Sequence, residues 1–390
     1  MEISEQYCMY RLAYYFVMEE KYDMLHINND RNEVWLEKRH KKNTNIIRFI
    51  PRGFNWKNHL KNDIARVFQR VKMLKNMFIG QNISIYNIYV TDTEPVDDWE
   101  ALKKPMILKE KKPVKMNVFY LTEDNFPDEE NRLFQKIHAN PISEQPLPDE
   151  AAQKKDVIYY KTILNDIVQK NRQEIKDTLT FGKLHITYLM IFLNLIMFTM
   201  LELQGGSMQS DVLIQFGAKY NPAIADGQWW RLVTSMFLHI GLLHLVLNMI
   251  ALYYIGAIAE RIYGSIRFTF IYLLAGIAGS LSSFAFDTHI SAGASGAIFG
   301  LFGALLYFGL IHQRLFQQTI GKSIALILII NLGLGFFVPQ IDMGAHLGGL
   351  LGGFLAASIV SLPRRRYLLW QILSLVGLIC IYGGLWWIGG

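Results

Sequence analysis

One serine opens an apolar stretch in which a polar side chain needs an explanation. Ser295 lies in the run GASGAIFG, residues 293–300, and the run LFGALLYFGLI that follows is almost entirely apolar. Small residues let helices approach closely, and packing explains the serine if it is taken alone. A serine hydroxyl also becomes a nucleophile when a neighbouring histidine takes its proton. The other polar residues of the apolar half decide between packing and chemistry.

Three further polar side chains lie near the ends of other apolar stretches. His346 lies in DMGAHLGGLLGG and is the candidate base for Ser295, because neutral imidazole is the usual proton acceptor for serine. His244 and Asn248 are four residues apart, so they share one helix face and are placed to donate hydrogen bonds to the oxyanion of an attacked amide. Asp342 is the acid nearest to His346 in sequence but lies toward the loop, so the pattern favours a Ser-His dyad over a triad.

Glycines accompany both the serine and the histidine at a spacing of four residues. The pairs are Gly296 with Gly300, Gly348 with Gly352, and Gly349 with Gly353. Small residues at this spacing let two helix backbones come close. A serine and a histidine on different helices reach hydrogen-bond distance only if the backbones approach, so packing and chemistry require the same residues here.

The elements that carry these residues are long apolar stretches in the second half of the chain. The chain has 390 residues, a net charge of +6 and 51% hydrophobic residues, and most of its charged residues lie before Lys183. A helix crosses a bilayer with about 20 residues. Seven stretches are long enough, at residues 184–203, 236–258, 265–285, 294–312, 321–339, 343–362 and 367–388. The sequence thus predicts a polytopic α-helical membrane protein with a six-helix core and a seventh C-terminal span.

The loops between these stretches indicate the orientation. Basic residues precede the first span and lie in every second loop after it: Arg172, Lys176, Lys183, Arg261, Arg267, Arg314, Lys322 and the run RRR at 364–366. Cytosolic loops are enriched in Lys and Arg, so the N-terminus is expected in the cytosol. The turns that carry Ser295, His346 and His244 then all enter from the outer side. Polar groups gathered at one depth in a membrane indicate a site in the protein interior or in a water-filled cavity.

Residues 1–178 are expected to form a cytosolic soluble domain of the α+β class. Residues 4–22 and 56–78 have helical patterns, and the runs NEVWLEK, NIIRFIP, ISIYNIYV and VKMNVFYLT have strand-like patterns. The run ANPISEQPLPDE, at 139–150, is a Pro-rich linker, and 151–178 is predicted to be a charged amphipathic helix. The predicted domains are the cytosolic domain at 1–178, a six-span core at 179–362 and a seventh transmembrane helix at 363–390.

Composition disfavours several classes of function. No basic groove with interleaved aromatic residues is visible, which argues against nucleic-acid binding. Cys8 lies near the N-terminus and Cys380 inside the last apolar stretch, so neither a disulfide framework nor a zinc pattern is indicated. Two acidic stretches, TDTEPVDDWE and LTEDNFPDEEN, offer carboxylates to a divalent cation, but solvated loops explain them better. No metal and no cofactor is expected, and the N-terminal domain is interpreted as a sensing or substrate-recruiting module.

Four motifs carry a resemblance to a known family. In chain order, QWWRLVTSMFLH, HIGLLHLVLN, GASG and AHLGG resemble motifs of the rhomboid family of intramembrane serine proteases, over residues 184–362. The resemblance implies that Ser295 is the nucleophile and His346 the general base. It implies that His244, Asn248 and the Ser295 backbone N–H bind the oxyanion. It assigns structural roles to His239, Trp230, Arg231, Gly293, Gly296 and Gly349.

The tryptophan and the arginine of this pattern also have simpler explanations. Trp230 suits an aromatic belt at the membrane interface. Arg231 suits either a cation that snorkels to the interface or a tether for its own loop. Both explanations are compatible with the roles that the resemblance implies.

One residue departs from the family pattern. Many members carry a tyrosine four residues after the serine, stacked on the catalytic histidine, and here this residue is Phe299. A phenyl ring can stack in the same way but has no hydroxyl, so we expect activity to survive. The seventh span and the N-terminal domain resemble the GluP-type (YqgP-like) branch of Gram-positive bacteria. Because the chain ends on the apolar run LWWIGG, we expect a further domain to follow it in the natural protein.

The sequence supports a protease and leaves one alternative. The protease would cleave transmembrane protein substrates near the outer face of a bacterial plasma membrane, surrounded by membrane lipids. The alternative is a non-enzymatic adaptor of the same fold that presents transmembrane clients to another protease on the cytosolic side. Inactive relatives lose the serine or the histidine, and this chain retains both. A transporter is disfavoured, because no inverted repeat or midplane charge pair is visible.

Overall fold

The computed structural model describes residues 3–390 apart from 41, 79, 143–146, 339–340 and 364–366. The arginine run at 364–366, on which part of the expected orientation rests, lies outside the described residues. The chain forms two compact units, Met1–Gln173 and Glu174–Gly390, and the boundary between them falls within one long helix, α4 (Glu150–Leu179). The domain boundaries that the sequence placed at 178 and 362 stay predictions.

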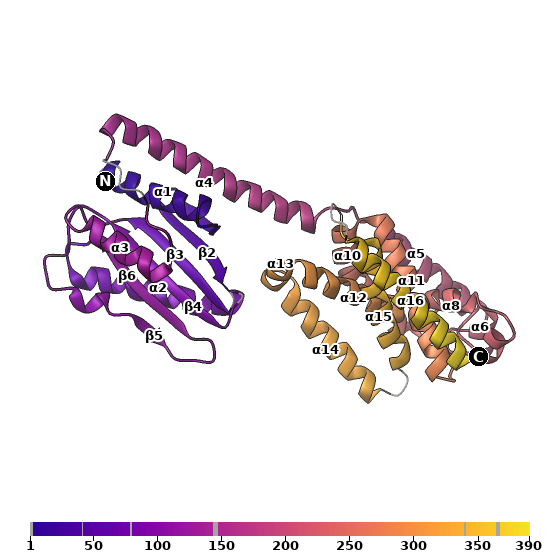
Figure 1. The fold of residues 1–390 in the computed structure, drawn as a ribbon. Helices are drawn as coiled ribbons and strands as arrows, with labels where there is room; N and C mark the ends of the chain where they lie inside the picture. The colour runs from indigo at the N-terminus through magenta and orange to yellow at the C-terminus, as the bar shows by residue number, and fades with distance from the viewer. Residues whose placement is uncertain (1–2, 41, 79, 143–146, 339–340, 364–366) are drawn as a thin grey trace. The chain divides into compact units, whose positions relative to one another are not determined.

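In the described part of the N-terminal unit, six strands form one mixed sheet (Figure 1). In their order across the sheet they are β1 (Asp23–Asn28), β2 (Glu33–His40), β3 (Asn43–Pro51), β4 (Asn82–Val90), β6 (Val114–Leu121) and β5 (Met106–Leu108). β3, β4 and β6 run parallel, and the other neighbouring pairs are antiparallel. The prediction of an N-terminal α+β domain is confirmed.

Helices bury two hydrophobic cores against this sheet. α1 (Ile3–Met18), α3 (Phe126–Ile137) and α4 contribute to one core, in which the rings of Phe16 and Phe134 stack. α2 (Lys57–Leu74) contributes Leu60, Ile64 and Val67 to the other core. The helical spacing of these three residues explains why one face of α2 is apolar. The N-terminal unit therefore has hydrophobic cores of its own.

Two elements of this unit differ from the sequence-based expectation. Residues 4–22 were predicted as one helix, but α1 ends at Met18, the chain turns through Lys21 with a φ of 57°, and β1 follows. α3 begins in the acidic run that was interpreted as a loop. Its Pro127 in the first turn and its acidic Asp128 and Glu129 are typical of a helix N-terminus, so the signal for α3 was present in the sequence.

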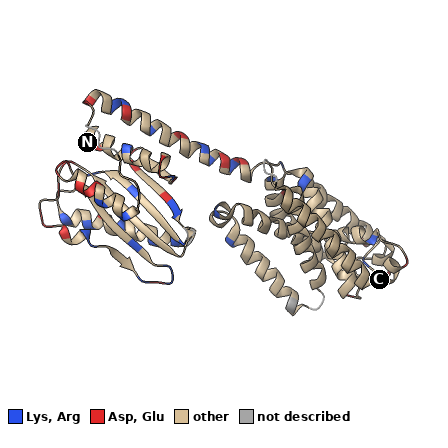
Figure 2. Cartoon of the chain, viewed as in Figure 1, with Lys and Arg blue, Asp and Glu red and all other residues tan. Residues whose placement is uncertain are grey.

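The second unit is helical and poorer in charged side chains than the N-terminal unit and α4 (Figure 2). Five of its described helices are long and apolar enough to cross a membrane: α5 (Ile186–Leu203), the continuous helix Leu242–Tyr263, α11 (Ser265–Phe286), α15 (Met343–Val360) and α16 (Leu368–Gly389). α12 (Ser295–Ile311) and α14 (Gly321–Phe337) are apolar but shorter, with 17 residues each. The connections contain α6 (Ser210–Gln215), α7 (Asn221–Ala225), α8 (Arg231–Thr234) and α13 (Gln313–Gln318). The prediction of a polytopic helical membrane protein is confirmed.

The second membrane helix begins later than predicted. The sequence placed this span at 236–258, but residues 235–237 form a 3₁₀ turn and the chain then extends to Gly241. The φ of Gly241 is 77°, a conformation that favours glycine and ends the extended segment. The helix consists of α9 (Leu242–Ala251), one π-helical turn (Leu252–Gly256) and α10 (Ala257–Tyr263). His244 therefore lies in the first turn of this helix.

Glycines bring α12 and α15 into backbone contact. A Cβ atom added to Gly349 would lie 2.0 Å from the carbonyl oxygen of Gly296, and one added to Gly353 would lie 2.0 Å from that of Gly300. Real Cβ atoms essentially never approach other heavy atoms to under 3.0 Å. No side chain therefore fits between the two helices at these points, and the turns that carry Ser295 and His346 are held close together.

A buried carboxylate anchors the first membrane helix. Glu260 of α10 is fully buried and accepts hydrogen bonds from the backbone N–H groups of Ile186 and Thr187, at 2.9 and 2.8 Å. Its other partners include the hydroxyls of Thr187 and Ser265. A negative charge at a helix N-terminus is favourable because the first N–H groups have no partner within the helix. No local pattern marks Glu260 as an anchor, because its partners lie on α5, more than 70 residues away in sequence.

Candidate active site

Ser295 and His346 lie on the first turns of two helices that touch. Ser295 is the first residue of α12, and His346 is the fourth of α15. The contact between the helices is made by the residues next to them: a Cβ added to Gly296 would lie 3.4 Å from the carbonyl oxygen of Ala345. The structure thus places the serine and the histidine that the sequence proposed as nucleophile and base on neighbouring helix turns.

Phe299 holds the ring of His346 over α12. The two rings stack with centroids 4.0 Å apart and an angle of 13° between their planes. Phe299 is one turn after Ser295, so the stack keeps the imidazole on the helix face that begins with the serine. The Nδ1 atom of His346 is buried and has no hydrogen-bond partner among the described residues, so no carboxylate orients the ring through that nitrogen.

Gly293 opens the space between His244 and Ser295. Its φ is 151°, and a Cβ at this position would lie 2.9 Å from His244 Cε1, 3.1 Å from His244 Nε2 and 3.8 Å from Ser295 Oγ. The imidazole of His244 and the hydroxyl of Ser295 therefore both lie beside Gly293, with no room for a Cβ atom next to the imidazole. The N–H of Ile240 donates to His244 Nδ1 at 3.4 Å, which favours the tautomer with the proton on Nε2. This proton is then available to an acceptor beside Ser295.

Asn248 lies one turn after His244 and is buried. Its Nδ2 atom donates to the carbonyl oxygen of His244 at 2.9 Å, within the same helix. An amide nitrogen carries two hydrogens, so one of them remains for a second acceptor. The side chain is placed on the face of α9 that bears His244, in agreement with the four-residue spacing.

His239 supports the segment that leads to the serine. It is fully buried, and its Nε2 atom accepts a hydrogen bond from the backbone N–H of Ala294 at 3.4 Å. Its ring packs edge-on against His244, with 5.3 Å between centroids. His239 therefore contacts both sides of the site without facing Ser295 directly.

Arg231 ties its own loop together. Its side chain is buried and donates to the carbonyl oxygens of Ile214 and Ala218, at 2.7 and 3.1 Å, and to the side chain of Gln228 at 2.8 Å. This geometry is that of a loop tether and not of a cation that snorkels to the interface. The neighbouring Trp230 is half exposed, as a residue of an interfacial aromatic belt would be.

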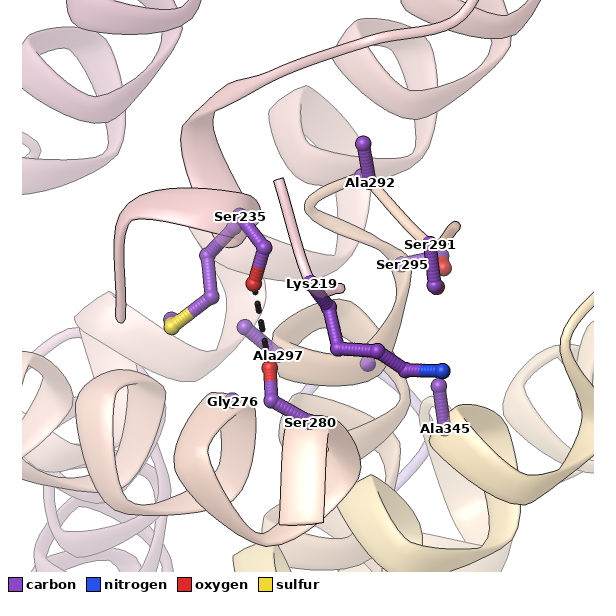
Figure 3. Close-up of a pocket in the computed structure, with 12 residues that line it drawn as sticks. Lys219, Ser235, Gly276, Ser280, Ser291, Ala292, Ser295, Ala297 and Ala345 are labelled. Atoms are coloured by element: carbon purple, nitrogen blue, oxygen red, sulfur yellow. Dashed lines mark hydrogen bonds between the residues drawn. The ribbon is translucent and has the colours of Figure 1, made fainter. Parts of the chain in front are cut away.

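A small cavity of about 20 Å³ lies behind the serine (Figure 3). Ser295 lines it together with Ser235, Ser280 and Lys219, and the hydroxyl oxygens of Ser235 and Ser280 are 3.3 Å apart. A cavity holds one water molecule when about 10–15 Å³ is open to the centre of that molecule and two or more polar groups can bind it. Sequence reasoning did not single out Ser235, Ser280 or Lys219, because nothing local marks them as neighbours of Ser295.

The two acidic stretches of the N-terminal unit border a larger cavity of about 540 Å³. Asp92 and Glu123, from the two stretches, line it together with Glu5 of α1, at the ends of β4 and β6. In the described part of the chain, no three His, Cys, Asp or Glu side chains are grouped so that they could hold a metal ion. The carboxylates therefore surround a ligand-sized space and do not form a metal cluster there.

Known proteins share both the membrane unit and the overall organisation. A family model described as the Rhomboid domain matches residues 226–363. Rhomboid protease GluP of Bacillus subtilis (strain 168) is 38% identical over 362 residues, which cover 92% of this chain and 70% of that protein. RHOMBOID-like proteins 5 and 2 of Arabidopsis thaliana are 37% and 40% identical over 161 and 162 residues, or 40% of this chain and 52% and 50% of theirs. The chain therefore belongs to the rhomboid family: it is a GluP-like, multi-pass intramembrane serine protease that acts on transmembrane protein substrates.

Proposed function

We propose that Ser295 and His346 form the catalytic dyad of this protease. The observation that carries the proposal is the contact between the first turns of α12 and α15, with the His346 ring stacked on Phe299. This arrangement leaves one hydroxyl and one imidazole at the meeting point of two helices. It supplies a nucleophile with a base, which is what acyl transfer by serine requires.

The dyad accounts for both halves of peptide-bond hydrolysis. Ser295 Oγ attacks the scissile carbonyl carbon while His346 takes its proton, and His346 then returns that proton to the leaving amine. A water molecule next attacks the acyl ester, with His346 again as base, and Ser295 regains its proton. Amides within a helix are already hydrogen-bonded, so a transmembrane substrate has to unwind locally before its carbonyl reaches Ser295.

The oxyanion is proposed to bind beside Gly293. His244 Nε2 lies next to this glycine, and the Ser295 backbone N–H and the free amide hydrogen of Asn248 complete the set of donors. Removing one donor of such a set typically reduces kcat by about 10²–10³-fold. The negative charge that develops during attack would thus meet donors that are already in place.

The cavity behind Ser295 is proposed to hold the water for deacylation. Its hydroxyl groups, from Ser235 and Ser280, are the polar partners that a buried water needs (Figure 3). A water at this position would lie next to the ester that forms on Ser295. Hydrolysis would then not depend on bulk water crossing the lipid-facing surface.

The dyad is tested with the protein in liposomes and a tagged transmembrane substrate. Cleavage by the wild type should be lost in Ser295→Ala and in His346→Ala, each compared with Lys322→Met, an exposed residue far from the site in sequence. Both dyad variants should still bind the substrate, because neither change removes the helices that contact it. Cleavage that persists in Ser295→Ala would identify a different nucleophile.

We further propose that the enzyme lies in a bacterial plasma membrane with its N-terminal unit in the cytosol and cleaves near the outer face. The basic loops support this orientation, because cytosolic loops are rich in Lys and Arg. In a Cys8→Ser, Cys380→Ser background, a membrane-impermeant maleimide should label Asp226→Cys in intact cells. It should label Glu100→Cys only after the cells are permeabilised. The reverse pattern would overturn the orientation.

The N-terminal unit is proposed to recruit partners, including a membrane protease that works on the cytosolic side. The support is that this unit has its own hydrophobic cores and carries a ligand-sized cavity bordered by carboxylates. A photo-crosslinker at Glu123 of the full-length Ser295→Ala protein should capture such a protease in cells, whereas one at Asp226 should not. Equal capture at both positions, or none at Glu123, would contradict this role.

A further inference from the structure

We propose that Lys219 is a positioning residue for the protease reaction: together with Asp342 it holds the loop before Ser295 and the start of the helix that carries His346 at a fixed separation. The inference rests on the proposed dyad. Lys219 is only 1% exposed and belongs to the unit that is poorer in charged residues. A buried ammonium group is unfavourable unless hydrogen bonds and opposite charge compensate for the lost water. The groups that bind this ammonium therefore indicate the structural role of its charge.

Lys219 binds the loop that leads to the nucleophile through both its side chain and its backbone. Its Nζ atom donates to the carbonyl oxygens of Asp287 and His289, at 2.6 and 2.8 Å. Its backbone forms a two-way bridge with Ser291, at 2.9 and 3.1 Å. The segment from 287 to 291 is thus fixed at three points, and α12 begins four residues later with Ser295.

The same ammonium group lies near the helix that carries the histidine. Figure 3 shows the Lys219 side chain reaching from its loop toward Ala345, next to His346. Asp342 is the residue that precedes α15, and its carboxylate caps the N–H of Ala345, so it lies on the α15 side of the cation. Burial lowers the pKa of Lys219, whereas the charges of Asp342 and Asp287 raise it.

Asp342 is tightly built into the start of α15. One carboxylate oxygen accepts the backbone N–H of Ala345 at 2.8 Å, and the other accepts the hydroxyl of Ser283 on α11. Its backbone carbonyl accepts the N–H of His346 at 3.2 Å. A displacement of Asp342 would thus be passed to the histidine directly. Asp342 therefore acts on His346 through the helix cap and not as the acid of a triad.

We call the interaction of Lys219 with the loop and with Asp342 the clamp. It restricts a sliding motion that the glycine contact between α12 and α15 leaves possible. Glycines let α12 and α15 touch but supply no side chains that would fix how far one helix slides along the other. A nucleophile and its base must stay within about 2.6–3.2 Å of each other to exchange a proton. A misplacement of about 1 Å can reduce the rate on the order of 100-fold. The attraction between Lys219 and Asp342 opposes such a slide.

The test compares charge-removing variants with matched controls in the full-length protein. Lys219→Met and Asp342→Asn are compared with Lys322→Met and Asp211→Asn, which alter exposed residues of the same types. The readouts are kcat and KM for a transmembrane substrate, the rate at which a fluorophosphonate labels Ser295, and the thermal midpoint. We expect kcat and the labelling rate to fall by about 10-fold or more in both variants, with KM and the controls unchanged. Lys219→Arg should restore part of the loss.

Four results decide the outcome. If Lys219→Met and Asp342→Asn fold and label like the wild type, the clamp is overturned, and the loss of labelling in Ser295→Ala still supports the dyad. If Lys219→Met does not fold, the kinetics of Asp342→Asn test the clamp, because asparagine can still cap the helix but carries no charge. If Ser295→Ala still reacts with the probe, the dyad itself fails, independently of Lys219. A double variant whose loss equals that of either single variant would support the clamp, because one interaction cannot be lost twice.

Discussion

At the scale of single residues, the site depends on what stands next to the serine and the histidine as much as on those two side chains. Gly293 leaves room for the imidazole of His244, and Phe299 fixes the ring of His346. Neither residue takes or gives a proton. Both determine the positions of the histidine side chains that take or donate protons.

Gly293→Ala should reduce kcat by about 100-fold or more, because the added methyl group would push His244 away from the oxyanion position. Gly227→Ala is the matched control: this glycine also has a positive φ, of 94°, but a Cβ there has nothing within 4 Å. The control carries the backbone strain without the collision. Steady-state kinetics on the two variants separate these effects, and equal losses in both would mean that strain alone is responsible.

Phe299→Tyr should keep its activity, whereas Phe299→Leu should lower kcat by up to about tenfold. An aromatic pair contributes about 0.5–1.5 kcal/mol beyond the area that it buries, and the leucine cannot stack on the imidazole. The rate of Ser295 labelling by a fluorophosphonate measures this directly. A leucine variant that labels at the wild-type rate would show that the stack does not orient His346.

At the scale of elements, the membrane unit is a set of helices whose contacts depend on residues with small side chains or none. α11, α12 and α15 meet through glycines, alanines and serines, so their backbones approach more closely than leucine-rich helices allow. α5 is attached differently, through the buried carboxylate of Glu260. Close packing therefore brings together the helices that carry the dyad, and a polar anchor attaches the first helix.

Gly353→Ala should destabilise the protein by about 1–3 kcal/mol, because its Cβ would lie 2.0 Å from the Gly300 carbonyl oxygen and the helices would have to separate. The matched control is Gly383→Ala in α16, where a Cβ meets nothing within 4 Å. That change should be neutral, or stabilising by up to about 1 kcal/mol, because alanine favours the helix over glycine. Thermal unfolding in detergent measures both. A Gly353→Ala protein as stable as the wild type would mean that α12 and α15 do not pack this closely.

At the scale of the whole molecule, two units of different chemistry share one chain. The C-terminal unit buries small residues at helix contacts and large apolar side chains between its helices, and the N-terminal unit buries aromatic and branched side chains on both faces of a sheet. Most charged residues lie in the N-terminal unit, so pH should affect its stability more than that of the membrane unit.

Burial raises the pKa of Glu5 from 4.5 to about 7, and the nearby Asp92 adds to the shift. The folded state then holds a proton that the unfolded state releases, so stability should fall as pH rises from 4.5 to 7 and level off above that. Glu5→Gln should remove this slope from the unfolding transition of the N-terminal unit, followed by calorimetry of the full-length protein. Glu100→Gln, at an exposed position, should keep it. A slope that survives Glu5→Gln would assign the pH dependence to another group.

Local patterns account for what could be predicted. Apolar length identified the membrane helices, and strand-like runs of residues identified β2, β3, β4 and β6, because both signals lie within one element. The start of the second membrane helix was misplaced, since hydropathy does not register that residues 235–241 form a turn and an extended segment. β1 was missed for a similar reason: it is short, and its pairing with β2 contains an irregularity that breaks the alternation.

Motifs in the sequence indicated the class of the protein and its candidate reacting groups: an intramembrane protease with Ser295 and His346, supported by His244 and Asn248. They could do so because motifs of fixed spacing on predictable helices carry that information. The folded chain alone places Lys219 against the loop before the serine, and the hydroxyls of Ser235 and Ser280 beside the cavity. These roles depend on which distant segments meet, and that is decided by the packing of α11, α12 and α15 and not by any pattern within a single stretch of chain.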